Sequence, residues 1–550
     1  MLDVIMVSSL EKVGAADKEA PLKKEFSLSG FLGETVSFQV AFRGNQKGAR
    51  VRAAAMVQGA DNCDAGLRVR LRQVLPVMCR CSCREEGADE DYLFTDTRMA
   101  PDLLRELEET GAELTGGWQA LWVDVLPEEG CRGGEYEICI SLTEEGEKEP
   151  AECRMNVRVI DRQLPELNIP HTEWFHCDGI VDYYGVDAFS DEFWRIFKNF
   201  LDVYVKRGGN TMYVPVMTPA LDTGEGLERT TIQLAGVELT EEGYRFDFTD
   251  LERFLDICLS GGIKYFEICH LFTQWGALAA PKVVATVNGE KKRIFGWDTP
   301  SDDPVYLKFL GELLPALKEL LSKRGLMENT FFHISDEPNL SSVKYQRAQG
   351  AVRPLLEGCT IMEAVSEYEY YAKGLVDIPV CATDFIEPFL EKRPPVLWSY
   401  YCCAQAKEVP NRFISMPSWR NRIYGVLLYW HHINGFLHWG FNFYNSILSR
   451  KKINPYETVD ADGGFPAGDP FMVYPGKNGI PEESIRLMVQ NEAIGDYRAL
   501  CLLEEKIGRE QVMDLIRQEA GMELSFRQYP RNAEFVLGLR EKVNGLLEKA

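Results

Sequence analysis

The chain has 550 residues, 45% of them hydrophobic and 11% aromatic, which is enough to form packed cores in roughly two to four domains. Its formal net charge of −24 excludes the broad basic face that a nucleic-acid or anionic-membrane partner requires. The 15 cysteines are odd in number and scattered along the chain, a pattern typical of reduced thiols and not of a secreted disulfide framework.

The N-terminal segment lacks a basic stretch followed by a long apolar run, and no apolar run in the chain reaches about 18 residues. We therefore predict a cytoplasmic protein without a signal peptide, a membrane span or a nucleic-acid partner. The one dense thiol cluster, Cys79, Cys81 and Cys83, lacks the C-x-x-C spacing of structural zinc sites, so we interpret these cysteines as strand residues. With no HExxH, P-loop or GxGxxG motif, neither a metal nor an organic cofactor is indicated.

Residues 1–165 alternate between hydrophobic and polar side chains, which is the period of a half-buried strand. The runs that show it are 34–42, 66–74, 135–142 and 152–160. Turn residues separate them, and hardly any stretch has helical spacing. The region is predicted to be an antiparallel β-sandwich, and the two prolines within 161–170 indicate a linker after it.

Residues 170–480 have a different pattern, in which short β-rich apolar runs alternate with longer segments of helical spacing. The eight candidate strands are 172–178, 211–217, 263–272, 329–337, 360–367, 378–385, 395–403 and 435–444. Eight strands with crossover helices predict a (β/α)8 barrel of the TIM type, with a doubly wound sheet as the alternative. Residues 481–550 contain two further helical stretches, which we expect to form an extension packed on the barrel.

Two adjacent carboxylates, Asp336 and Glu337, end the fourth candidate strand in the sequence FFHISDEP. In a barrel of this type the chemistry lies at the carboxyl ends of the strands, so both residues are predicted at the barrel mouth. Neighbouring strand residues point to opposite faces, and both acids can therefore face the mouth only if the strand twists or bulges there.

Aromatic and polar residues gather near the other strand ends. Aromatic faces beside carboxylates are typical of a neutral-sugar site, and two carboxylates are the minimum for glycoside hydrolysis. Periodicity alone does not say whether Trp439 lines the barrel or packs under the helices. The candidate substrate-binding residues are His176, His270, Trp275, His333, Glu367, Trp398, Tyr400, Trp439, Asn442, Tyr444 and Asp469.

Several motifs resemble glycoside hydrolase family 123 and its DUF4091-type relatives. They occur in the order SDEP, PVLWSYYCC, NRIYGVLLYWHHINGFLHWGFNFYN, GDPFMVYPG and ESIRLMVQNEAIGDYRAL. The resemblance implies a retaining exo-glycosidase of the β-N-acetylgalactosaminidase kind, in which the 2-acetamido oxygen of the substrate attacks the anomeric carbon. Asp336 would then orient the acetamido group, and Glu337 would act as general acid and base. The resemblance also implies that Trp439 forms part of the floor under the sugar.

Two alternatives remain open. The first is a glycosidase of the same fold that acts on another sugar, with Glu367 or Asp384 as the partner of Glu337. The second is a non-catalytic carbohydrate-binding barrel, which the intact acid pair disfavours. Each of the three hypotheses requires an oligosaccharide or glycoconjugate as the ligand.

Overall fold

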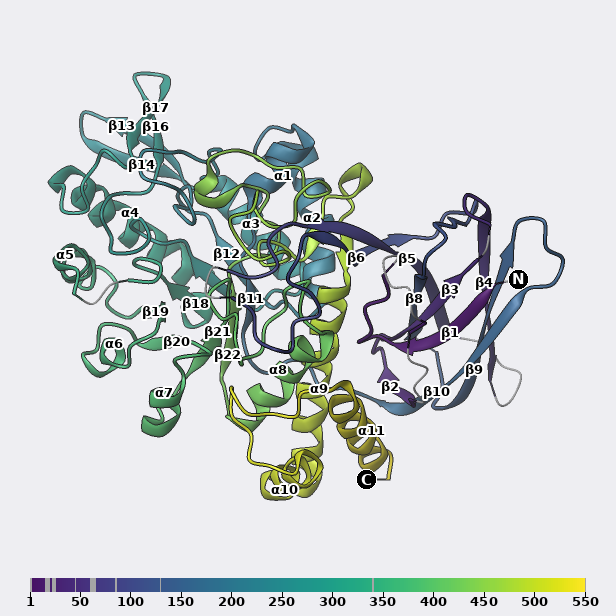
Figure 1. Ribbon diagram of the computed structural model, residues 1–550. Coiled ribbons are helices and arrows are strands. Elements are labelled where there is room, and N and C mark those ends of the chain that lie inside the picture. The colour runs from purple at the N-terminus through teal and green to yellow at the C-terminus, as the bar shows by residue number, and fades with distance from the viewer. Residues whose placement is uncertain are drawn as a thin grey trace.

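The computed structural model describes residues 2–14, 20–21, 26–44, 46–59, 66–84, 87–128, 130–338 and 341–549. Met1 and residues 15–19, which belong to the N-terminal segment considered above, lie outside the described residues. Figure 1 shows two lobes: β-sheets rich in N-terminal strands on the right, and a barrel surrounded by helices on the left, with the long helix α9 (Ile485–Ile507) between them.

Two sheets form the N-terminal lobe, and a core that includes Phe38, Val123 and Ile138 lies between them. The four strands predicted here are confirmed as β3, β5, β9 and β10. The seven-stranded sheet has the order β1 (Asp3–Ser8), β3 (Val36–Arg43), β8 (Gln119–Pro127), β5 (Leu67–Cys79), β6 (Arg98–Glu106), β24 (Glu482–Ser484) and β23 (Val473–Tyr474). The five-stranded sheet has the order β2 (Leu28–Leu32), β10 (Ala151–Gln163), β9 (Gly134–Glu144), β4 (Arg50–Gly59) and β7 (Ala112–Glu113).

The second lobe is built around a closed barrel in which neighbouring strands are parallel. Each of the eight candidate strands is confirmed as a barrel strand, in chain order. They are β11 (His171–Glu173), β12 (Thr211–Val214), β15 (Tyr265–Ile268), β18 (Thr330–Phe332), β19 (Thr360–Val365), β20 (Ile378–Ala382), β21 (Trp398–Tyr400) and β22 (Gly435–His438).

The predicted fold class is nevertheless wrong, because strand and helix do not alternate regularly around the barrel. Two connecting helices are very short, α6 (Glu369–Ala372) and α7 (Glu387–Lys392). Two other connections contain hairpins, which join in a separate mixed four-stranded sheet at the upper left of Figure 1. Its strands are β14 (Gly243–Asp247), β13 (Gly236–Thr240), β16 (Val283–Val287) and β17 (Glu290–Phe295).

The hairpin between β16 and β17 turns at Asn288 and Gly289, both of which have positive φ angles. Asn-Gly is a strong hairpin signal, because these residues adopt the left-handed conformations of a tight turn at low cost. The hairpin could therefore have been read from the sequence. The longer connecting helices are α1 (Cys177–Tyr184), α2 (Asp191–Lys206), α3 (Thr249–Gly261), α4 (Pro304–Lys323), α5 (Val343–Val352) and α8 (Ser418–Trp430). Single-turn 3₁₀ helices span Met327–Asn329, Ile447–Ser449 and Lys477–Gly479.

The N-terminal lobe also differs from a purely antiparallel sandwich. The pair β2–β10 is parallel, and β24, which precedes α9 in the chain, pairs with β6 of the large sheet. The C-terminal helices contact both lobes: α9 packs on α8 of the barrel, and α11 (Ala533–Lys549) contacts β2 and β10. A further helix, α10 (Arg509–Ala520), connects them. The boundaries 1–165, 170–480 and 481–550 stay a prediction.

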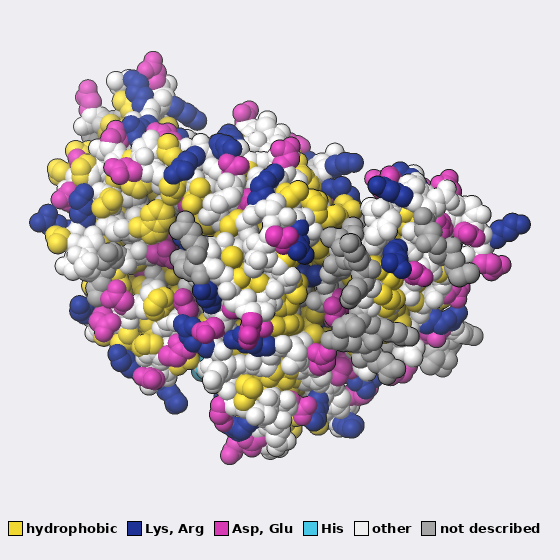
Figure 2. All heavy atoms as spheres, in the orientation of Figure 1, with side chains coloured by type: hydrophobic (Ala, Val, Ile, Leu, Met, Phe, Trp, Pro, Cys, Tyr) yellow, Lys and Arg dark blue, Asp and Glu magenta, His cyan; other side chains and the backbone are white. Residues whose placement is uncertain are grey.

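The face drawn in Figure 2 is mixed in charge and also shows hydrophobic side chains, most of them across its middle. Carboxylates and cationic side chains are interspersed across the face drawn in Figure 2. Among the described residues, no helix combines the length and the apolar composition that crossing a membrane would require. Cys79 of the CRCSC cluster is a buried residue of β5, as its interpretation as a strand residue predicted, and Cys81 and Cys83 follow that strand.

Candidate active site

A cavity of about 360 Å³ lies at the carboxyl ends of the barrel strands. Its walls come from segments far apart in the sequence: loops after β12, β15, β18, β21 and β22, together with Arg84 from the N-terminal lobe. Asp336, Glu337, Trp275, Tyr400 and Trp439 line it, all of them candidates from the sequence. Asp222, Trp174 and Phe465 line it as well.

The two adjacent acids both reach this cavity because the chain has already left the strand. The strand β18 ends at Phe332, and Glu337 has a φ of 40°, in the left-handed region that few non-glycine residues adopt. This backbone conformation replaces the twist or bulge expected from the sequence. The Asp336 carbonyl accepts a hydrogen bond from the Trp275 amide at 2.9 Å, which ties the acid loop to the loop after β15.

The acids have different surroundings. Glu337 is exposed to the cavity, and its Oε1 accepts a hydrogen bond from the Tyr400 hydroxyl at 2.9 Å. Asp336 is more enclosed: burial, together with the Glu337 and Glu363 carboxylates, raises the pKa of Asp336 well above its usual range, and His333 opposes this shift. These surroundings favour the protonated form of Asp336 in the free site.

Aromatic rings form the apolar part of the cavity. Trp275 is 52% exposed, an unusually high fraction for a tryptophan. Two kinds of contact fix the Trp439 side chain. Its Nε1 donates a hydrogen bond to Oδ2 of the buried Asp469 at 3.0 Å, and its ring packs on Phe443 and Phe465. Asp469 thus positions an aromatic side chain and does not line the cavity itself.

Unusual backbone conformations concentrate around this cavity. Besides Glu337, the lining residues Asp222, Trp275 and Leu448 have φ angles of 41°, 60° and 59°. Each such residue costs on the order of 1–3 kcal/mol and persists where the surrounding structure enforces it, which occurs often at binding and catalytic sites.

A fully buried polar layer lies inside the barrel beneath the cavity. His333 follows β18, and its Nε2 is 2.9 Å from Glu267 Oε2, which also accepts a hydrogen bond from Trp174 Nε1 at 2.9 Å. His270 Nδ1 is 3.0 Å from the Tyr213 hydroxyl. His270 and His333 were predicted to bind substrate, but the structure places them in this layer, outside the cavity lining.

The remaining candidates lie outside the cavity lining. Asn442 exchanges two hydrogen bonds with the His176 backbone, at 2.8 and 3.1 Å, and these join the loops after β11 and β22. The Tyr444 hydroxyl donates to the Val473 carbonyl at 2.9 Å. Trp398 is buried at the level of Phe331, one inward-facing position deeper than Tyr400. Glu367 is exposed beyond the end of β19.

The sequence reasoning missed Glu267 and Glu363, both of which are fully buried in the middle of apolar strands. Charged residues are almost never fully buried unless they are paired, so a glutamate inside KYFEICH or TIMEAV was a signal. Asp222 was missed because it lies in a loop without a local pattern.

The sequence model of the family "Glycoside hydrolase 123, catalytic domain" matches residues 174–503, which is more than half of the chain and includes the barrel mouth. The chain therefore belongs to glycoside hydrolase family 123, as the motifs suggested. At the level of its family it is a glycoside hydrolase, and its substrates are of the carbohydrate or glycoconjugate class.

A solved structure supports the same fold. A family 123 glycoside hydrolase from Clostridium perfringens, studied for glycolipid glycan hydrolysis, has a TM-score of 0.73 and 13% identity, covering 100% of this chain and 97% of that chain. The β-glucuronidase of Parabacteroides merdae has a TM-score of only 0.30 and 11% identity, covering 91% of this chain and 52% of that chain. No curated protein matches the chain.

Proposed function

We propose that this protein is a retaining exo-glycoside hydrolase that cleaves β-linked N-acetylhexosaminides, most simply β-N-acetylgalactosaminides, with the 2-acetamido group of the substrate as nucleophile. The observation that supports it best is the adjacency of Asp336 and Glu337 in one cavity beside aromatic walls. Because neighbouring carboxylates cannot flank the scissile bond from opposite sides, a nucleophile supplied by the substrate fits this arrangement better than one supplied by the protein.

The two acids would divide the work. The acetamido N–H donates to Asp336 and orients the acetamido oxygen toward the anomeric carbon, while Glu337 protonates the leaving oxygen and later deprotonates water. In the free site the proton is favoured at Asp336. A hydrogen bond from the acetamido N–H stabilises the ionised form of Asp336, so substrate binding would transfer the proton to Glu337.

The cavity suits an apolar sugar face. Trp439 and Trp275 would pack against the ring, with Trp439 held by Asp469 beneath the sugar. The alternative, a glycosidase for another sugar with Glu367 as nucleophile, is less well supported because Glu367 does not line the cavity. Asp384, the other alternative partner, accepts a hydrogen bond from Gln405 Nε2 at 2.8 Å and is likewise outside the lining.

A panel of nitrophenyl glycosides, with and without the 2-acetamido group and in gluco and galacto configuration, tests the proposal directly. Turnover should require the acetamido group, and a thiazoline analogue of the cyclic intermediate should inhibit competitively, because it resembles the charged species that the site stabilises. Full activity on 2-hydroxy sugars with indifference to the thiazoline would reject substrate assistance. In that case loss of activity in Glu367→Gln would identify the alternative nucleophile.

Changing Asp336 separates the roles of the acids. Asp336→Asn should impair formation of the cyclic intermediate, so activated aryl leaving groups should restore little activity. The same leaving groups should restore much of the activity of Glu337→Gln, because they need less protonation. Equal rescue of both variants would contradict the division of roles.

A further inference from the structure

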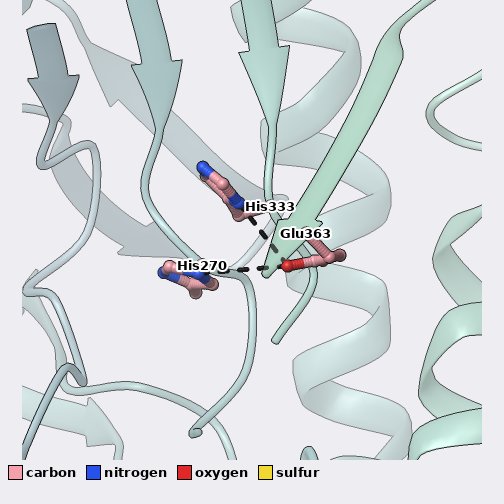
Figure 3. A group of neighbouring side chains, drawn as sticks. All are labelled: His270, His333 and Glu363. Carbon is pink, nitrogen blue, oxygen red and sulfur yellow. Dashed lines mark ion pairs between the residues drawn. The ribbon is translucent and has the colours of Figure 1, made fainter. Parts of the chain in front are cut away.

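Three side chains from adjacent barrel strands converge in the buried layer beneath the cavity (Figure 3). The strands β15, β18 and β19 are neighbours in the barrel and run parallel. His270 follows the end of β15, His333 follows β18, and Glu363 lies within β19. Their exposed fractions are 2%, 0% and 0%.

One atom of each side chain has no hydrogen-bond partner among the described residues: His270 Nε2, His333 Nδ1 and Glu363 Oε2. These are the atoms that face one another. Glu363 Oε2 is 3.5 Å from His333 Nδ1 and 4.0 Å from His270 Nε2, and the three atoms lie within 4.8 Å of one another. Leaving a buried polar atom unpaired costs about 1–3 kcal/mol, so three at one point call for a common partner.

The opposite side of each residue is already held in place. His333 Nε2 is 2.9 Å from Glu267 Oε2, and His270 Nδ1 is 3.0 Å from the Tyr213 hydroxyl. Glu363 Oε1 accepts hydrogen bonds from the backbone amides of Ile334 and Ser335. Metal-binding histidines are commonly oriented in this way, with the second ring nitrogen bonded to a carboxylate or another polar group.

We propose that His270, His333 and Glu363 bind one divalent transition-metal ion, with zinc as the best fit. Two imidazole nitrogens and one carboxylate oxygen are ligands that zinc accepts, whereas magnesium and calcium prefer oxygen alone. Ligands around a tetrahedral zinc lie roughly 3.4 Å apart, so side-chain shifts below about 1 Å would bring the three atoms into range.

The charge of the cluster favours the ion. With both histidines neutral and both carboxylates ionised, Glu267 and Glu363 would carry two negative charges, which a dication would balance. A proton alone is the competitor: although burial opposes it, Glu267 and Glu363 raise the pKa of His333 to about 10. That proton would serve His333 but leave His270 Nε2 unpartnered.

The ion would position protein groups and take no part in the proposed hydrolysis. It would link β19 to the segments that follow β15 and β18 and fix the segment His333–Ser335, which leads directly into Asp336 and Glu337. The sequence shows no metal motif because the ligands come from three strands and are separated by tens of residues. The site goes beyond the proposed hydrolysis and does not depend on its mechanism.

The test measures metal in untagged protein purified without metal-affinity resin. Plasma mass spectrometry should find about one zinc equivalent per chain, in wild type and in the control His431→Gln. His431 is a matched control because it is a half-buried histidine that stacks on Phe526, away from the cluster. His270→Gln and Glu363→Gln should retain less than about a tenth of an equivalent. Removing the metal from wild type should lower the melting temperature, and zinc chloride should restore it.

If either ligand variant fails to fold, X-ray absorption of the wild type decides the question. Nitrogen and oxygen neighbours at about 2.0–2.1 Å with an imidazole signature would support the site. Sulfur neighbours would overturn it, because the cluster contains no thiol. Wild type that carries no metal and whose melting temperature ignores added zinc would also overturn it, as would full metal retention in both ligand variants.

Discussion

Two buried regions of this protein enclose carboxylates, and they balance the charge with different partners. Where the two lobes meet, arginines balance the charge of the carboxylates. Arg486 makes a bidentate pair with Asp102 at 2.8 Å, and Arg72 contacts Glu483 at 2.6 Å. In and beneath the cavity the partners are tyrosine and histidine: Tyr400 contacts Glu337 in the cavity, and His333 contacts Glu267 in the layer beneath it. Arginine stays charged at any ordinary pH, whereas histidine can gain or lose a proton.

The difference separates a structural use of charge from a chemical one. Where the two lobes meet, bidentate arginine–carboxylate pairs such as Arg486–Asp102 hold both side chains in one geometry. In the cavity, titratable groups such as Asp336 and Tyr400 leave protonation adjustable, which the proposed acid–base catalysis requires. Charge burial by itself would not distinguish the two regions; the identity of the partner does.

The largest expected effect concerns Glu337, which accepts its hydrogen bond from a tyrosine. Glu337→Gln should reduce turnover of a substrate with a poor leaving group by about 10²–10⁴-fold, because the general acid is lost. The control Glu391→Gln changes an exposed glutamate of α7 and should leave the rate unchanged. Comparable rates on a natural disaccharide would remove Glu337 from the mechanism.

Changing Glu483 tests the arginine-paired region. Glu483 is buried between Arg72 and Arg207, so Glu483→Gln should destabilise the fold by about 3–5 kcal/mol, because it leaves two buried cations under-compensated. Its neighbour Glu482 pairs with the partly exposed Arg105, and Glu482→Gln should cost about 0–1 kcal/mol. Thermal unfolding measures both, and similar shifts would refute the contrast.

The sequence predicted strands better than connections. Each of the eight barrel strands came from an apolar run, since burial on both faces leaves a clear hydrophobic pattern. The fold class failed at the connections, where α6 and α7 are very short and the β16–β17 hairpin is inserted ahead of the crossover helix α4. Strand pairings between distant segments, such as β24 with β6, leave no local pattern at all.

The candidate site shows the same limit. Asp336, Glu337 and Trp439 could be proposed because each lies at a strand end. His270 and His333 could not be placed above or below the cavity floor, because a period of two gives the face of a strand and not the depth along the barrel. Glu363 became visible only when three strands were brought together.

A pH series tests whether arginine pairing always keeps a buried carboxylate ionised. Burial raises the pKa of Glu492 from 4.5 to about 7, although Arg422 opposes the shift. Because the folded-state pKa is above the unfolded value, this contribution to stability is present below about pH 4.5 and is lost as pH rises toward 7. The loss is on the order of 3 kcal/mol.

Glu483 should show the opposite sign. Burial raises its pKa, but Arg207 and Arg72 outweigh burial and hold the pKa well below its usual range, so its contribution is present above about pH 4.5 and lost in acid. The stability of Glu492→Gln should therefore fall less than that of wild type between pH 4.5 and 7. A parallel pH dependence of the two proteins would show that Glu492 does not titrate in this range.

The smallest expected effect concerns the Tyr400 hydroxyl, which donates a hydrogen bond to Glu337. Burial, with Glu337 beside it, raises the pKa of Tyr400 well above its usual value, so Tyr400 remains a donor to Glu337 at every working pH. Tyr400→Phe removes one hydrogen bond to a charged group, worth about 1.5–3 kcal/mol, and should lower kcat about 10- to 100-fold.

The matched control is Tyr401→Phe: Tyr401 packs on Tyr424 and Phe436 outside the cavity, and its hydroxyl has no hydrogen-bond partner among the described residues. Activated aryl glycosides should narrow the gap between Tyr400→Phe and wild type, because the hydroxyl acts through the acid. If the gap were equally wide for every leaving group, Tyr400 would act on the sugar and not on Glu337.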